Sequence, residues 1–121
     1  MNRRRIGTQY ETQACAYLTQ KRYMILERNY RCRQGEIDII AKDVESQMLV
    51  FCEVKYRHDN SHGDPLEAVD NRKQRQICRT ALVYYTYHGY TQEMPCRFDV
   101  IAIYGDGQIT HIENAFAYTR S

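Results

Sequence analysis

The sequence predicts an α/β fold in which a mixed β-sheet is flanked by helices, in the order α-β-β-β-α-β-β. Helical periodicity at the start of the chain, followed by three short apolar runs, supports the first half of this order. A long helical segment then precedes the last two strand-like runs, and its length suits a crossover to a parallel strand. A chain of 121 residues fits one domain, which we expect to span residues 1–121.

The first helix is expected over residues 4–21, because small and apolar side chains recur at helical spacing between Gly7 and Leu18. Glu11 is an acid within this stripe. Thr8 stands three residues before it, which matches a capping box. The pattern alone therefore somewhat favours a helix-capping role for Glu11 over a role in a functional site.

Five strands are expected, bounded by turn-forming residues. Gly35 marks the turn after the first strand, and the segment 105–107, Gly-Asp-Gly, is typical of a hairpin turn. The last eight residues are expected to form a loosely held tail. The predicted strands are 23–31, 36–41, 48–56, 97–104 and 108–113.

Alternation of side chains across the second and third strands predicts which residues share a face. In the second strand, Glu36, Asp38 and Ile40 fall on one face, and the intervening residues Ile37, Ile39 and Ala41 fall on the other. In the third strand, Leu49, Phe51, Glu53, Lys55 and Arg57 share a face. Both faces carry apolar residues, so we expect the sheet to be covered on both sides.

The second helix is expected from residue 65 to residue 88. Asp64 and Pro65 form a good helix start, while Asp70 is able to cap a second start and thereby break the helix. A basic row on one side of this helix is usually a solvated face, but it also suits contacts to a phosphate backbone. The row consists of Arg72, Arg75 and Arg79.

The overall composition excludes several classes of protein. A net charge of +2, from 17 basic and 15 acidic residues, does not by itself indicate a nucleic-acid partner. Five widely spaced cysteines without a Cys-x-x-Cys pair argue against a disulfide framework and against a zinc knuckle. We expect a cytoplasmic protein, because free thiols suit a reducing compartment and no membrane-spanning run or signal peptide is evident.

Charged residues inside the second and third strands require an explanation, because an unpaired buried charge is costly. If these strands are hairpin partners, Asp38 and Glu53 can face each other. Two carboxylates ~4 Å apart repel by about 4 kcal/mol at an effective dielectric constant near 20. Mg²⁺ or Mn²⁺ would neutralise them, and Lys55 would then orient water or stabilise developing charge. An ion pair of Glu53 with Lys55 explains the pattern equally well.

The same residues carry a resemblance to known proteins. Asp38 followed fifteen residues later by Glu53-Val54-Lys55 resembles the PD-(D/E)XK nuclease superfamily, with Ile37 standing where the superfamily name has proline. More closely, the chain resembles the YraN family of uncharacterised bacterial proteins, which is similar to archaeal Holliday junction resolvases. The matching pieces are Gly7-x-x-x-Glu11, Arg28-Asn29-Tyr30, Gly35-Glu36-Ile37-Asp38, Phe51-Cys52-Glu53-Val54-Lys55-x-Arg57, Lys73 with Ala81, and Arg97-Phe98-Asp99-Val100.

This resemblance implies a restriction-endonuclease-like core and a Mg²⁺-dependent endonuclease acting on DNA, including branched forms such as Holliday junctions. It implies that Asp38 and Glu53 ligate the metal, that Lys55 assists the water, and that Glu11 joins the acids, which reverses the preference for capping. A non-catalytic nucleic-acid-binding or protein-interaction module on the same fold is the alternative. Junction cutting usually needs two active sites, so a homodimer is plausible. The residues expected to contact nucleic acid are Arg57, Arg72, Lys73, Arg75 and Arg79.

Overall fold

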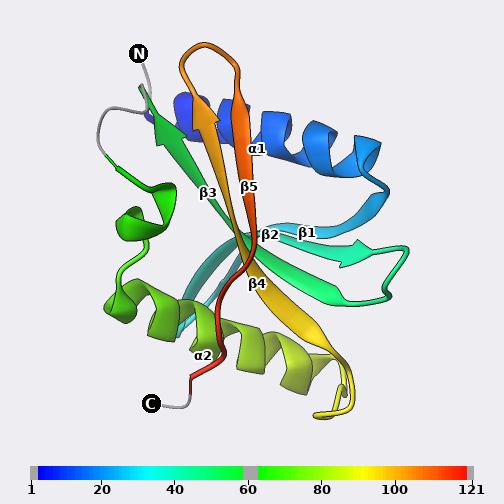
Figure 1. Ribbon diagram of the computed structural model, residues 1–121. Coiled ribbons are helices and arrows are strands. Elements are labelled where there is room, and N and C mark those ends of the chain that lie inside the picture. Colours follow the sequence, from blue (N-terminus) through cyan, green and yellow to red (C-terminus); the bar gives the residue numbers. More distant parts are fainter. Residues whose placement is uncertain (1–2, 59–62, 120–121) are drawn as a thin grey trace.

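The computed structural model describes residues 3–58 and 63–119 and contains a five-stranded mixed sheet between two helices (Figure 1). The strands lie in chain order, β1-β2-β3-β4-β5, so that β3 is central. Helix α1 lies on one side of the sheet and helix α2 on the other. The order α-β-β-β-α-β-β and the mixed sheet predicted from the sequence are confirmed.

The first half of the chain is a helix followed by a meander. Helix α1 spans Arg3–Gln20, and the strands β1 (Tyr23–Cys32), β2 (Gly35–Asp43) and β3 (Leu49–Arg57) follow through short turns. Strand β2 pairs antiparallel with both β1 and β3, as the short connections between these strands require.

The second half crosses over the sheet to return in parallel. A short 3₁₀ helix, η1 (Pro65–Ala68), precedes α2 (Asn71–Tyr87), so the helix expected over 65–88 is broken. The Asp70 carboxylate caps α2 by accepting a hydrogen bond from the Lys73 amide, which confirms its role as a second helix start. Strand β4 (Cys96–Tyr104) then pairs parallel with β3, and β5 (Ile109–Phe116) pairs antiparallel with β4.

Each face of the sheet packs against one helix. On the face covered by α2, the buried residues Ile40, Phe51 and Phe98 form a core with the helix residues Ile77 and Tyr84. A separate core on the other face joins α1 to the sheet. Its members include Ala14, Leu18, Ile39, Ala41, Val50, Cys52, Ile101 and Ile103. The expectation that the sheet is covered on both sides is therefore confirmed.

Three details of the sequence-based prediction are wrong. Because α1 begins at Arg3, Thr8 and Glu11 lie inside the helix and do not form a capping box at its start. Ile37 packs in the same core as Ile40, between the sheet and α2, although strict alternation places these two residues on opposite faces. The expected tail begins too early, because β5 continues to Phe116, which packs against the core.

None of the helices in the described ranges is both long enough and apolar enough to cross a membrane.

Candidate metal centre

Asp38 lies at the point where β2 separates from β3. Backbone pairing between these strands runs from Lys42 opposite Leu49 to Ile39 opposite Cys52 and ends there. One residue further along, Asp38 Oδ2 instead accepts a hydrogen bond from the backbone N–H of Val54, at 2.8 Å. The shifted side-chain alternation at Ile37 coincides with this separation of β2 from β3, while Ile37 stays paired with Tyr30 of β1.

The carboxyl group of Asp38 is held close to a second acid. Burial, followed by the charge of Glu53 and a hydrogen bond between the two carboxyl groups, raises the pKa of Asp38 to about 8, well above its ordinary value of 3.8. Glu11 adds a smaller contribution in the same direction, whereas the Val54 amide opposes the rise. Without a bound metal ion, burial and the neighbouring acids therefore favour the protonated form of Asp38 at neutral pH.

Three carboxyl groups converge on a space that suits a small divalent ion. Oxygen atoms of Glu11, Glu36 and Asp38 all lie within 4.8 Å of one another. Opposite ligands of an octahedral Mg²⁺ are about 4.2 Å apart, so shifts of under ~1 Å would bring these oxygens into place. Oxygen ligands are also what Mg²⁺ and Mn²⁺ prefer. The residues present therefore fit such an ion.

Glu36 is a candidate ligand that the sequence analysis did not single out. It precedes Asp38 by two residues, and the predicted alternation already placed both on one face of the strand. The preceding Gly35 adopts φ +152°, and a Cβ there would lie 2.5 Å from Gln76 Cγ of α2, so the turn that presents Glu36 packs tightly against the helix. Glu36 also forms an ion pair with Arg31, at 3.1 Å.

Glu53, which is expected among the metal ligands, contacts two lysines. It is only 5% exposed, and its Oε2 lies 3.5 Å from both Lys55 Nζ and Lys73 Nζ. Lys55 comes from the same strand, whereas Lys73 reaches Glu53 from the first turn of α2. The ion pair and the acidic cluster, which the sequence offered as alternatives, are thus both present, joined through the contact of Asp38 with Glu53.

Comparisons with known proteins identify the family. The model of an uncharacterised protein family, UPF0102, matches residues 10–103. The chain belongs to this family. A UPF0102 protein of Lachnoclostridium phytofermentans is 47% identical over 116 residues, covering 96% of each chain. Another, from Coxiella burnetii, is 41% identical over 111 residues, covering 92% of this chain and 91% of the relative.

The range matched by the UPF0102 model contains all the side chains of the candidate centre. They come from α1, β2, β3 and α2, so four elements of the family fold contribute to it. The resemblance to the YraN family inferred from the sequence motifs is thereby confirmed.

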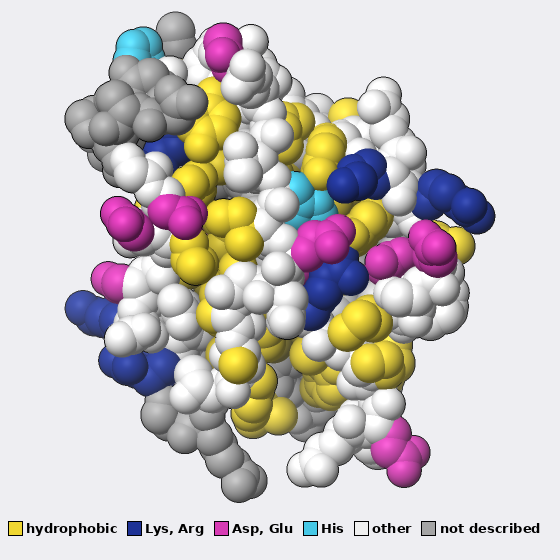
Figure 2. Space-filling model, viewed as in Figure 1, with side chains coloured by type: hydrophobic (Ala, Val, Ile, Leu, Met, Phe, Trp, Pro, Cys, Tyr) yellow, Lys and Arg dark blue, Asp and Glu magenta, His cyan; other side chains and the backbone are white. Residues whose placement is uncertain are grey.

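The residues expected to contact nucleic acid are dispersed in this UPF0102 member. Arg72 and Arg79 are exposed on α2, Arg75 is half-buried, and Lys73 is directed to Glu53. Arg57 Nη2 donates a hydrogen bond to the carbonyl oxygen of Asp64, at 3.3 Å. On the face seen in Figure 2, acidic and hydrophobic side chains separate the basic ones, so the basic residues on that face form no continuous stripe.

A second buried acid, Asp99, lies in β4 on the α1 side of the sheet. Its carboxylate is fully buried and accepts hydrogen bonds from Arg97 Nε and from the Asn114 amide, at 3.1 and 3.0 Å. Asp99 Oδ2 also lies 2.7 Å from His111 Nε2. Although burial of the guanidinium opposes it, hydrogen bonding to Asp99 and its charge raise the pKa of Arg97. Every hydrogen-bonding direction around Asp99 is used.

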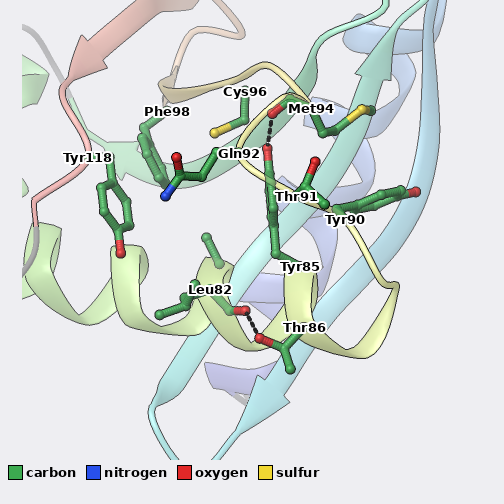
Figure 3. Close-up of a pocket in the computed structure, with 11 residues that line it drawn as sticks. Leu82, Tyr85, Thr86, Tyr90, Thr91, Gln92, Met94, Cys96, Phe98 and Tyr118 are labelled. Carbon is green, nitrogen blue, oxygen red and sulfur yellow. Dashed lines mark hydrogen bonds between the residues drawn. The ribbon is translucent and has the colours of Figure 1, made fainter.

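A cavity of about 690 Å³ lies at the other end of the molecule from the candidate centre. It is formed by the last turns of α2, the following loop and the start of β4, with Tyr85, Tyr90, Phe98 and Tyr118 among its walls (Figure 3). Tyr85 Oη donates a hydrogen bond to the Met94 carbonyl oxygen at 2.7 Å, which fixes the loop against the helix. The acidic residues take no part in this cavity.

Proposed function

We propose that this protein is a metal-dependent endonuclease that hydrolyses DNA phosphodiester bonds, with branched or structured DNA such as Holliday junctions as its substrate class. The observation that carries the proposal is the convergence of four carboxyl groups around the end of the β2–β3 ladder. Glu11, Glu36 and Asp38 have oxygens within 4.8 Å of one another, and Glu53 lies close enough to raise the pKa of Asp38. Such a concentration of acids is stable only with a proton or a cation.

The residues that would hold Mg²⁺ or Mn²⁺ are Glu11, Glu36 and Asp38, with Glu53 beside them. A bound divalent ion polarises a phosphodiester and makes water a better nucleophile. The backbone hydrogen bond from Val54 fixes Asp38 Oδ2, so that the other oxygen of this carboxylate keeps a defined direction.

Two lysines supply the positive charge that phosphodiester cleavage requires. Lys55 and Lys73 are each 3.5 Å from Glu53 and about one-third exposed, so Glu53 positions them while their ammonium groups stay accessible. A DNA phosphate entering from solvent would meet these ammonium groups, which favour the negative charge developing on its oxygens. Lys55 is then placed to orient the attacking water, and Lys73 to bind phosphate.

The test is cleavage of a panel of linear, flapped and four-way-junction DNAs in Mg²⁺ and in Mn²⁺. We expect cutting of at least one branched form, and its loss by at least 100-fold in Asp38→Asn, Glu53→Gln and Lys55→Met. Glu93→Gln, which changes an exposed acid on the loop after α2, is the matched control and should cut normally.

Absence of cutting on the whole panel with both metals would contradict the enzyme proposal. Salt-dependent DNA binding in EDTA, unaffected by Glu53→Gln, would then favour the non-catalytic nucleic-acid-binding alternative. Resolving a four-way junction requires two cuts, so we also expect a homodimer on DNA, measurable by sedimentation. The five free cysteines suit action in a reducing cytoplasm.

A further inference from the structure

Two tyrosines stack in parallel beside the candidate centre. The rings of Tyr10 in α1 and Tyr56 in β3 have centroids 4.3 Å apart and an interplanar angle of 12°. Despite this contact, Tyr56 is 42% exposed. One buried ring on the α2 side, Tyr84, instead meets Tyr30 and Phe51 edge to face, at 88° and 83°.

The position of this tyrosine pair connects it to the acidic cluster. Tyr10 directly precedes Glu11, and Tyr56 directly follows Lys55, so the backbone atoms of each tyrosine lie within one residue of the candidate centre. Lys55 and Arg57, on either side of Tyr56 along β3, bring two cationic side chains to the same strand end. Because side chains alternate along a strand, Lys55 and Arg57 lie on one face of this strand end and the exposed Tyr56 ring lies on the other, so an anionic strand that reaches this end meets both.

The pair is also held in place. Gly105, in the turn after β4, approaches so closely that a Cβ there would lie 3.2 Å from the Tyr56 hydroxyl oxygen and 2.9 Å from the His58 carbonyl oxygen. Tyr10 supports the other side of the stack by packing against the α1 core. A rigid aromatic surface loses little conformational entropy when a planar ligand stacks on it.

We propose that the tyrosine pair is a stacking platform for an unpaired nucleobase of the DNA substrate. This inference rests on the proposed function and narrows it. Within a duplex both faces of a base are covered by its neighbours, so only an unpaired or extruded base can stack on a protein ring. The platform therefore selects DNA with unpaired nucleotides next to the cut phosphate, such as flaps, gaps and open junction centres, over continuous duplex.

The experiment measures DNA binding in EDTA, where no cleavage occurs. Two oligonucleotides of equal length are used, one single-stranded and one a blunt duplex, each with 2-aminopurine as a fluorescent base. We expect Tyr56→Leu to weaken single-strand binding about 5- to 100-fold and to abolish quenching of the fluorescent base, with duplex binding unchanged. Tyr56→Phe and Tyr56→Trp should retain both signals.

Tyr87→Leu is the matched control, because Tyr87 is 83% exposed on α2 and lies outside the platform. Equal single-strand binding by the wild type and Tyr56→Leu would overturn the proposal, and so would an equal loss on both DNAs. If Tyr56→Leu does not melt cooperatively, Tyr10→Leu replaces it with the same expected result. If the wild type stacks the fluorescent base but cuts no DNA, only the nuclease proposal fails. The stacking proposal would stand, since the binding assay contains no metal.

Discussion

Asp38 and Asp99 are two acids in neighbouring regions of one sheet, and their surroundings differ. Asp99 is enclosed by Arg97, His111 and a backbone amide, so its charge is matched within the fold. Asp38 receives one backbone hydrogen bond and otherwise faces other acids, and its pKa rises to about 8. The charge of Asp99 is therefore balanced without a ligand, whereas Asp38 requires a proton or a cation.

The difference shows how a small domain can separate stability from function. The contacts of Asp99 join β4 to β5, and Arg97 links them to Tyr23 and Asp43, which pair with each other at one end of the β1–β2 ladder. The carboxyl groups around Asp38, in contrast, repel one another, and a bound cation would relieve this repulsion. Three predictions follow from this contrast, in order of decreasing effect.

Removing the charge of Asp99 should have the largest effect on folding. Asp99→Asn leaves the guanidinium of Arg97 buried without its nearest counter-charge, which should lower the free energy of unfolding by about 3 kcal/mol. Urea denaturation at pH 7 measures this. The control Asp106→Asn changes an exposed acid in the β4–β5 turn and should stay within about 0.5 kcal/mol of wild type. A similarly small effect of Asp99→Asn would mean that the cluster is not structural.

The same substitution at Asp38 should act in the opposite direction and depend on pH. Between pH 4 and pH 8 the folded protein keeps the Asp38 proton while the unfolded chain releases it, so the stability of the metal-free protein falls as pH rises through this window. Asp38→Asn removes that slope and should be more stable than wild type by about 2 kcal/mol at pH 9. Denaturation in EDTA at pH 5, 7 and 9 tests this, and parallel pH profiles for the two proteins would refute it.

Divalent cations should produce the smallest of the three effects. Mg²⁺ or Mn²⁺ at ten times its dissociation constant stabilises the folded state by about 1.4 kcal/mol, or roughly 3–6 °C in melting temperature. We expect this shift in the wild type and its loss in Glu36→Gln and Asp38→Asn, with Glu93→Gln behaving as wild type. An equal shift in all four proteins would indicate that the ions bind elsewhere.

The sequence predicted the fold well because its signals are local. Alternation in the third strand correctly separated Leu49 and Phe51 from Val50 and Cys52, and the cap at Asp70 marked the break before α2. The alternation failed at Ile37, which lies just beyond the end of the β2–β3 pairing and is still paired with Tyr30 of β1. Such a departure depends on tertiary contacts that a strand pattern does not contain.

The composition of the candidate centre was less accessible to prediction. Spacing brought Asp38 and Glu53 together, but it did not show that two lysines hold Glu53 or that Glu36 clusters with Glu11 and Asp38. Lys73 comes from another element, so only the packing of α2 against the sheet reveals its contact. Asp99 and its partner His111 were not assigned roles, because the sequence does not show which buried acids are paired.

The parallel pairing of β3 with β4 also has a consequence for folding kinetics. The four clustered acids all lie in the stretch from Glu11 to Glu53, which forms a helix and a meander with contacts close in sequence. Strand β4 must join across the crossover, and such long-range pairings are slow because loop closure comes first. We therefore expect the acids to come together before β4 joins the sheet, and protons or divalent ions to accelerate that step.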